Sequence, residues 1–512
     1  MNAIGGNTEF GHAGEAPDID VAIVGAGISG IGMAAHMHKL CPDRSYAILE
    51  RRADLGGTWD LFRYPGIRSD SDMHTLGFVF EPWKHEKSIA DGPSILDYLN
   101  RIVDERGIRP NIRFDTRVVS ANWDSAAALW RIVTETADGR RGETTARFVY
   151  LGSGYYDYDD PYDAGFAGRE TFKGELIHPQ FWPKDFDYSG KRVLVIGSGA
   201  TAVTIVPAMA EKAAKVTMLQ RTPTWYGIRP AKDAFANTLR KFLPEKVAYA
   251  ITRFKNIRLQ NLVFKRARTQ PEKVRDFLTE RLKDALGDKY DAATFTPPYN
   301  PWEQRLCLVP DADMFEAIKA DRAEIVTGHI DRFDQTGVLL KDGRHLDADV
   351  IVTATGLKLA VAGKIAFSID GAPIDFSQHF FYKGCMFSNV PNLALVFGYL
   401  NASWTLRADI DSDYVCRLLN HMKRTGTEVA TPCLAADHGL VEDDIFEFFS
   451  SGYLQRARGS QPKNATEQPW RLNQDYVKDK PWLKASPIDD GVMRFGHARS
   501  LATNEPALEA AE

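Results

Sequence analysis

The chain has 512 residues, 44% of them hydrophobic and 26% charged, the balance of an ordinary globular protein with room for two or three domains. A formal net charge of −5 gives no global reason to expect nucleic-acid binding. Five scattered cysteines without a C-x-x-C pair argue against a disulfide framework and a zinc site, so we expect no metal. No apolar run could span a membrane, and residues 1–17 resemble a flexible leader rather than a signal peptide, so we expect a cytoplasmic protein.

A first dinucleotide site is predicted near the N-terminus. The run at 19–24 is short and β-branched, as in a buried parallel strand, and it is followed by a glycine turn, a helical pattern and a second strand that ends in an acid. In such a unit the glycines permit a tight turn and close approach of the pyrophosphate, the helix N-terminus faces the phosphates, and the acid bonds the ribose hydroxyls. The residues in these positions are Gly25, Gly27, Gly30 and Glu50.

A second unit of the same kind begins with a predicted strand at 191–196. Its turn has Ala202 where a third glycine would stand, and its second strand, at 216–219, is followed by a basic residue instead of an acid. An acid there would repel a 2′-phosphate, whereas Arg221 can bind one, so this unit predicts NADPH. The candidate residues are Gly197, Gly199, Thr201, Arg221 and Thr222.

Between the two units lies a stretch with the spacing F-x-G-x3-H-x3-W-P. Its residues are Phe172, Gly174, His178, Trp182 and Pro183. Taken singly, they could be a turn glycine, a linker histidine and a loop cap. The full spacing directly before the second turn resembles the fingerprint of type I Baeyer–Villiger monooxygenases, flavoproteins that insert oxygen beside a ketone carbonyl. The related flavin-containing monooxygenases have a similar fingerprint, usually without the terminal Trp-Pro.

Three further segments carry the resemblance. The run Gly57-Thr58-Trp59 is similar to the segment along the flavin in these enzymes, which makes the first unit an FAD site. Asp70 ends an R-Y-P-G-x-R-x-D run, which makes it an active-site candidate rather than half of a surface ion pair. Arg305 follows P-Y-N-P-W-E-Q and falls where the branch of the mycobacterial ethionamide-activating monooxygenase has its catalytic arginine. Gln304 departs from the lysine of many members.

The resemblance implies a reaction. NADPH would reduce FAD, the reduced flavin would trap O2 as a C4a-peroxyflavin, and this adduct would convert a ketone to an ester or lactone, with thioethers as further substrates. Arg305 would stabilise the anionic adduct, Asp70 would position Arg305 and also contact the cofactor, and His178 would link domain motion to NADPH handling. One alternative is a flavin monooxygenase of nitrogen or sulfur, and another is a flavin reductase or a redox-sensing binding module.

The expected fold is α/β, with two Rossmann-like dinucleotide-binding domains and a helical insertion. The boundaries assign 18–154 and 357–445 to the FAD-binding domain, 155–228 and 320–356 to the NADP-binding domain, 229–319 to the insertion and 446–512 to a tail that wraps the surface.

Residues 229–283 hold fifteen Lys or Arg and five Asp or Glu, mixed with aromatic and long apolar side chains. This composition favours a basic-faced helical insertion over a patch that touches an anionic membrane. The sequence does not predict the oligomeric state or which ketone is used.

Overall fold

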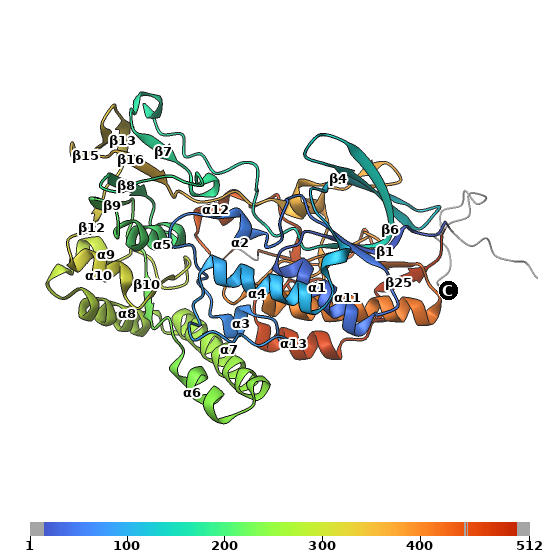
Figure 1. The fold of residues 1–512 in the computed structure, drawn as a ribbon. Helices are drawn as coiled ribbons and strands as arrows, with labels where there is room; N and C mark the ends of the chain where they lie inside the picture. Colours follow the sequence, from blue (N-terminus) through green and yellow to red (C-terminus); the bar gives the residue numbers. More distant parts are fainter. Residues whose placement is uncertain (1–14, 445–446, 448, 499–512) are drawn as a thin grey trace, which may run out of the picture.

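The computed structural model describes residues 15–444, 447 and 449–498, so most of the predicted leader lies outside the described residues. Two large sheets, one mixed and one parallel, form two α/β bodies, with the sheet of β1 and β6 at one end of the molecule and that of β8 and β9 at the other (Figure 1). This architecture confirms the predicted α/β class with two Rossmann-like units.

The nine-stranded sheet has the order β18-β17-β4-β5-β6-β1-β2-β3, and β21 also pairs with β6. Its parallel part holds the first nucleotide unit, in which all but Asp20 of β1 is buried, as the apolar run predicts. Its strands are β1 (Ile19–Val24), β2 (Tyr46–Leu49), β3 (Ile112–Arg113), β4 (Arg117–Asp124), β5 (Leu129–Glu135), β6 (Arg141–Leu151), β17 (Ala366–Ile369), β18 (Ala372–Pro373) and β21 (Leu393–Leu395). Helices α1 (Ile28–Leu40), α4 (Gly92–Glu105) and α11 (Trp404–Thr425) pack into the same core.

The second sheet is five-stranded and wholly parallel, with the order β12-β9-β8-β16-β7. The carboxyl ends of parallel strands meet at one edge, which is where ligands bind in such sheets. Helix α5 (Ala200–Met209) begins at this edge, directly after the second glycine turn. The strands are β7 (Glu175–Ile177), β8 (Arg192–Ile196), β9 (Lys215–Gln220), β12 (Ala323–Thr327) and β16 (Val350–Thr353).

The insertion is shorter than the predicted 229–319. Helices α6 (Ala234–Phe242), α7 (Glu245–Thr269), α8 (Pro271–Leu286) and α9 (Ala292–Phe295) form it. Strand β11 (Cys307–Pro310) then pairs with β10 (Tyr226–Arg229), and α10 (Asp313–Lys319) buries its apolar face against the second sheet. The sequence placed the end of the insertion too late because β11 pairs with β10, a strand that precedes the whole insertion in the chain. Among the described helices, none combines the length and apolarity of a membrane span.

The prediction of a surface tail is wrong for much of 449–498. Helix α13 (Tyr476–Ala485) packs on α11, and β25 (Met493–Gly496) pairs with β22 (Val429–Pro432). Trp470, Leu472 and Leu483 are buried in the two main cores. These buried apolar residues are widely spaced within a polar segment, so the composition of the segment did not indicate their burial.

Candidate active site

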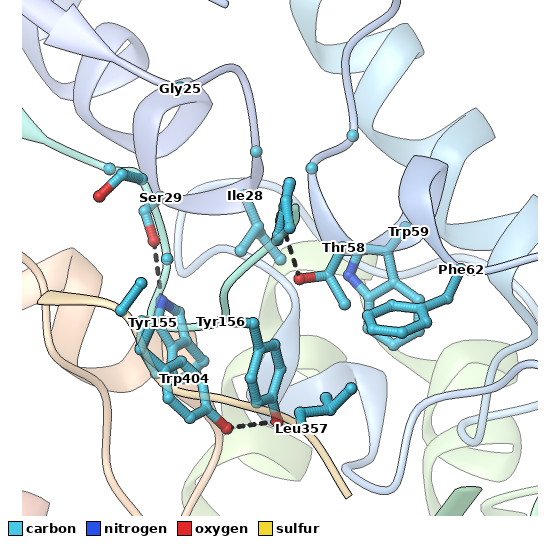
Figure 2. Close-up of a pocket in the computed structure, with 18 of the residues that line it drawn as sticks. Gly25, Ile28, Ser29, Thr58, Trp59, Phe62, Tyr155, Tyr156, Leu357 and Trp404 are labelled. Carbon is cyan, nitrogen blue, oxygen red and sulfur yellow. Dashed lines mark hydrogen bonds between the residues drawn. The ribbon is translucent and has the colours of Figure 1, made fainter. Parts of the chain in front are cut away.

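A cavity of about 320 Å³ lies between the first glycine loop, the segment after β6 and the start of α5. Figure 2 shows part of its lining, with aromatic side chains facing the loop at Gly25. Many of the residues predicted from the sequence line this cavity: Gly25, Gly27, Glu50, Gly57, Thr58, Trp59, Asp70, Thr201 and Arg305.

The first glycine loop is shaped for close backbone approach. Gly25 has a φ of +96°, which favours glycine, and a Cβ on Gly30 would lie 1.9 Å from the carbonyl oxygen of Gly25. Gly57 has a φ of +57°, and a Cβ there would lie 3.0 Å from the Cα of Gly27. The two segments therefore form a side-chain-free cradle at the N-terminus of α1, which suits a pyrophosphate.

Glu50 presents a fixed carboxylate to the same cavity. Its Oε2 accepts a hydrogen bond from the backbone N–H of Ala26 at 2.6 Å, and its Oε1 accepts one from that of Arg52 at 2.9 Å. Burial raises the pKa of Glu50, while these two N–H donors act in the opposite direction. Each oxygen keeps a further lone pair, so the carboxylate can accept hydrogen bonds from ribose hydroxyls.

An aromatic wall, whose two rings are not among the predicted site residues, faces the glycine loop. The ring of Tyr155 stacks on Trp404 with centroids 4.8 Å apart and 12° between the ring planes. Trp404 is held by a hydrogen bond from its Nε1 to Ser29 Oγ at 2.8 Å, and the hydroxyls of Tyr155 and Tyr156 are 2.6 Å apart (Figure 2). In the sequence, the only sign of this wall was the pair of tyrosines that directly follows Gly154.

The residues that line this cavity fit a flavin dinucleotide. Ser153 Oγ lines the cavity, is buried and has no hydrogen-bond partner among the described residues, so it is available to a ligand. The glycine cradle, the Glu50 carboxylate and the flat aromatic wall match the phosphates, the ribose and the ring system of FAD.

Arg305 and Asp70 meet at the cavity wall. Arg305 Nη2 lies 3.0 Å from Asp70 Oδ2, and both side chains are about one-third exposed. The carboxylate of Asp70 raises the pKa of Arg305 above its ordinary value, so the guanidinium stays charged. The two arginines of the run pair elsewhere, Arg63 with Asp60 and Arg68 with Asp313.

The predicted NADPH residues gather at the carboxyl edge of the second sheet. Gly197 has a φ of +132°, and a Cβ there would lie 2.3 Å from the carbonyl oxygen of Ala354. Gly199 directly precedes α5, and no atom outside its chain neighbours lies within 4 Å of its Cβ position, which leaves room for a ligand. Ser198 Oγ donates to the carbonyl oxygen of Thr222 at 3.4 Å, which places Arg221 beside the turn. Of this group, only Thr201 lines the cavity described above.

The fingerprint residues pack the linker against the second sheet. A Cβ on Gly174 would lie 2.5 Å from the ring of Phe172, so the glycine lets this ring reach the core. Trp182 packs edge-on against Phe186, while Pro183 is exposed.

His178 directly follows β7, at the same edge as the second glycine turn. Its Nδ1 accepts from the backbone N–H of Gln180 at 3.2 Å, and its Nε2 is buried without a partner among the described residues. Burial lowers the pKa of His178, so the imidazole is held in its neutral form. The unpartnered nitrogen is available to a ligand or to a moving segment.

Comparisons with known proteins agree with this geometry. A family model described as flavin-binding monooxygenase-like matches residues 87–363, and one for an NAD(P)-binding Rossmann-like domain matches residues 23–86. The probable FAD-binding monooxygenase AlmA of Acinetobacter baylyi is 47% identical over 93% of this chain and 96% of its own length. The FAD-containing monooxygenase EthA of Mycobacterium tuberculosis is 47% identical over 93% of this chain and 97% of its own.

Solved structures share the fold at lower identity. An oxidized steroid monooxygenase bound to NADP superposes with a TM-score of 0.73 at 22% identity, covering 94% of this chain and 99% of that one. A cyclohexanone monooxygenase bound to ε-caprolactone has a TM-score of 0.73 at 20% identity, covering 93% and 99%. The resemblance found in the sequence is confirmed: with a family model over more than half its length and relatives nearly half identical throughout, the chain belongs to the flavin-binding monooxygenase-like family.

Proposed function

We propose that this protein is a Baeyer–Villiger monooxygenase that uses FAD, NADPH and O2 in the cytoplasm to convert ketones to esters or lactones, with thioethers as further substrates. The observation that carries the proposal is the Arg305–Asp70 pair at the wall of a cavity whose lining fits FAD. When bound, FAD supplies the transfer of electrons from NADPH to O2. The names of the relatives, which are FAD-containing or FAD-binding monooxygenases, support the cofactor.

Each of these residues has a separate role in the proposed reaction. Glu50 and the first glycine loop hold the ribose and the pyrophosphate, and Tyr155 with Trp404 shields the ring system from water. Arg305 stabilises the negative charge that develops on the reacting oxygens, because a guanidinium remains charged and does not donate its proton near neutral pH. Asp70 fixes the direction of that guanidinium. Arg221 would bind the 2′-phosphate at the other sheet edge.

The proposed reaction requires that Arg305 act as a fixed cation rather than as an acid. Oxidation of amines or sulfides by the same cofactor is favoured by protonation of the reacting oxygen, and Arg305 with a raised pKa is a poor proton source. This is why the geometry favours ketones as the main substrates.

The test measures three quantities in one assay: NADPH consumed, H2O2 released and oxygenated product formed. The substrates are linear, cyclic and aryl ketones and thioethers. Ester or lactone formed in proportion to NADPH supports the proposal. Product from thioethers or amines alone would replace it with a heteroatom monooxygenase, and NADPH use without any oxygenated product would replace it with a reductase.

A further inference from the structure

Helix α7 buries several polar side chains and exposes large apolar ones. Its buried face carries Thr252, Arg253 and Asn256 beside Ala248, Tyr249 and Ala267, whereas Phe254 is 63% exposed. A surface helix ordinarily buries its apolar stripe and exposes its polar one. The exposed apolar side chains of α7 are Val247, Ile251, Phe254, Leu259, Leu262 and Val263.

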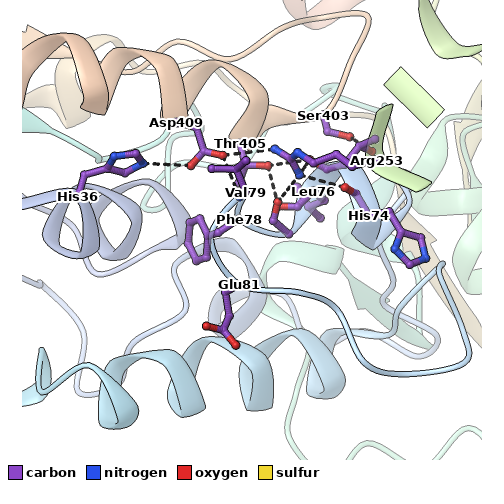
Figure 3. A network of polar contacts seen from close by, with 12 residues as sticks. His36, His74, Leu76, Phe78, Val79, Glu81, Arg253, Ser403, Thr405 and Asp409 are labelled. Carbon is purple, nitrogen blue, oxygen red and sulfur yellow. Dashed lines mark hydrogen bonds and ion pairs between the residues drawn. The ribbon is translucent and has the colours of Figure 1, made fainter. Parts of the chain in front are cut away.

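A polar network locks α7 in this orientation (Figure 3). Arg253 Nη1 donates to the backbone oxygens at the end of α3 (Met73–Leu76) and beyond it, with distances of 3.0, 3.2 and 2.7 Å to His74, Thr75 and Gly77. Its Nη2 lies 3.3 Å from Asp409 Oδ2 on α11. Turning the apolar face inward would break this network and leave buried charges unpaired, which is costly. The exposure of the apolar face is therefore a consequence of the fold.

The apolar surface continues onto the neighbouring helices, where Phe242 at the end of α6 is 79% exposed. Phe235 of α6 and Phe277 of α8 are exposed as well, and we call the exposed side chains of these three consecutive helices the α6–α8 face. Nine of the thirteen large apolar side chains exposed among the described residues lie on this face, a concentration that marks an interaction site. In Figure 1, α6 and α7 project from the lower edge of the molecule.

Basic side chains are interleaved with the apolar ones. Arg258 lies over the ring of Phe254 at 5.2 Å, and Arg281 lies over that of Phe277 at 5.9 Å. Within the described part of the chain, several exposed basic residues of the face have no acidic side chain within ion-pair distance; they are Lys241, Lys246, Arg258 and Arg266.

The charge of the α6–α8 face indicates what kind of partner it can bind. Residues 229–283 carry ten more positive than negative charges, although the whole chain carries −5, so the remainder is acidic. Two copies that met symmetrically through this face would repel each other. An anionic bilayer attracts the basic side chains and takes up the apolar ones at its headgroup boundary, and it repels the acidic remainder.

We propose that the α6–α8 face docks on an anionic lipid bilayer. Phe242, Phe254 and their apolar neighbours enter the interface, and the basic side chains lie at the headgroups. The sequence favoured a merely basic-faced insertion because a count of residues does not reveal which face of α7 is buried.

The test uses the FAD-loaded full chain and flotation with vesicles of phosphatidylcholine, with or without phosphatidylglycerol. We expect binding to the anionic vesicles, weaker binding to the neutral ones, and loss of binding as salt screens the charges. The triple variant Lys241→Gln, Lys246→Gln, Arg258→Gln should bind roughly 100-fold more weakly, from about a fivefold contribution per basic residue. The double variant Phe242→Gln, Phe254→Gln should lose roughly tenfold or more.

Control variants remove the same number of basic residues, and an exposed apolar side chain, outside the face. Arg140→Gln, Arg332→Gln, Lys341→Gln removes three exposed basic residues outside the face, and Val441→Gln removes an exposed apolar side chain. Flavin content and thermal unfolding verify that each variant is folded. No binding to anionic vesicles, or equal effects of face and control variants, would overturn the proposal. So would self-association in sedimentation velocity that the face variants abolish while vesicles remain unbound, since the face would then join copies of the chain.

Discussion

Arg305 and Asp70 come from segments far apart in the sequence, yet Arg305 Nη2 lies 3.0 Å from Asp70 Oδ2 at the cavity wall. The pairing sets the direction of the guanidinium and raises its pKa. Arg305 is thus a permanent positive charge whose position depends on a carboxylate.

Replacing Arg305 should separate oxygenation from flavin reduction. Arg305→Ala should still bind FAD and consume NADPH, but the electrons should appear in H2O2, and product formation should fall roughly 10²–10³-fold through loss of one preorganised charge. Arg305→Lys should recover little, because a point charge does not reproduce the planar fork. Asp70→Asn should show a milder form of the same defect. Arg63→Ala is the control; a product-to-NADPH ratio near wild type in Arg305→Ala would show that the arginine is structural.

Glu50 should contribute to FAD affinity. Glu50→Gln removes a charged acceptor from the cavity, and a hydrogen bond to a charged group contributes about 1.5–3 kcal/mol, so the Kd for FAD should rise roughly ten- to a hundredfold. Quenching of flavin fluorescence during titration of apoprotein measures it directly. The exposed Glu143→Gln is the control, and equal Kd values for the two variants would contradict a role for Glu50 in binding.

Arg221 should discriminate between the two nicotinamide coenzymes. Arg221→Ala should raise the KM for NADPH roughly ten- to a hundredfold and leave that for NADH nearly unchanged, because only NADPH carries the 2′-phosphate. Steady-state NADPH and NADH oxidation by the same preparation gives both values. Arg322→Ala removes another exposed basic residue of this domain as the control. Equal rises for both coenzymes would exclude recognition of the phosphate by Arg221.

His178 should make stability depend on pH below about 6.5. Because burial lowers the pKa of His178 in the folded state, the unfolded chain binds more protons between that pKa and about 6.5. The free energy of unfolding is therefore highest above this window and falls as pH drops through it. His178→Gln should flatten the fall in urea unfolding experiments at several pH values, whereas the exposed His438→Gln should not. Identical pH profiles for wild type and His178→Gln would refute the assignment.

Arg253 should be important for stability although it does not line the candidate active-site cavity. Arg253→Met leaves Asp409 buried without its cation, which should lower the free energy of unfolding by about 3–5 kcal/mol. On the same helix, Arg258 points outward, and Arg258→Met should change it by less than about 0.5 kcal/mol. Adding Asp409→Asn to Arg253→Met should restore part of the loss. Urea denaturation measures all three, and similar values for the two arginine variants would contradict a structural role of the network.

The sequence alone determined the parts of this protein that depend on local order. Strand, glycine turn, helix and acid follow one another within a short segment, so Gly25, Gly27 and Glu50 could be predicted to share one site, and the family resemblance added Arg305; all four line the same cavity. Both the α/β class and the membership of a flavin monooxygenase family are confirmed.

Tertiary structure alone decided what depends on contacts between distant segments. The Tyr155–Trp404 wall, the end of the insertion at β11 and the burial of Trp470 and Leu483 each join residues whose proximity no local pattern encodes. Helix α7 shows the reason most clearly. A mixed pattern of charged and apolar residues predicts a helix but does not show which of its faces is buried. That depends on whether another part of the chain accepts hydrogen bonds from Arg253, and the carbonyl groups that do so, those of His74 and Gly77, lie far from α7 in the sequence.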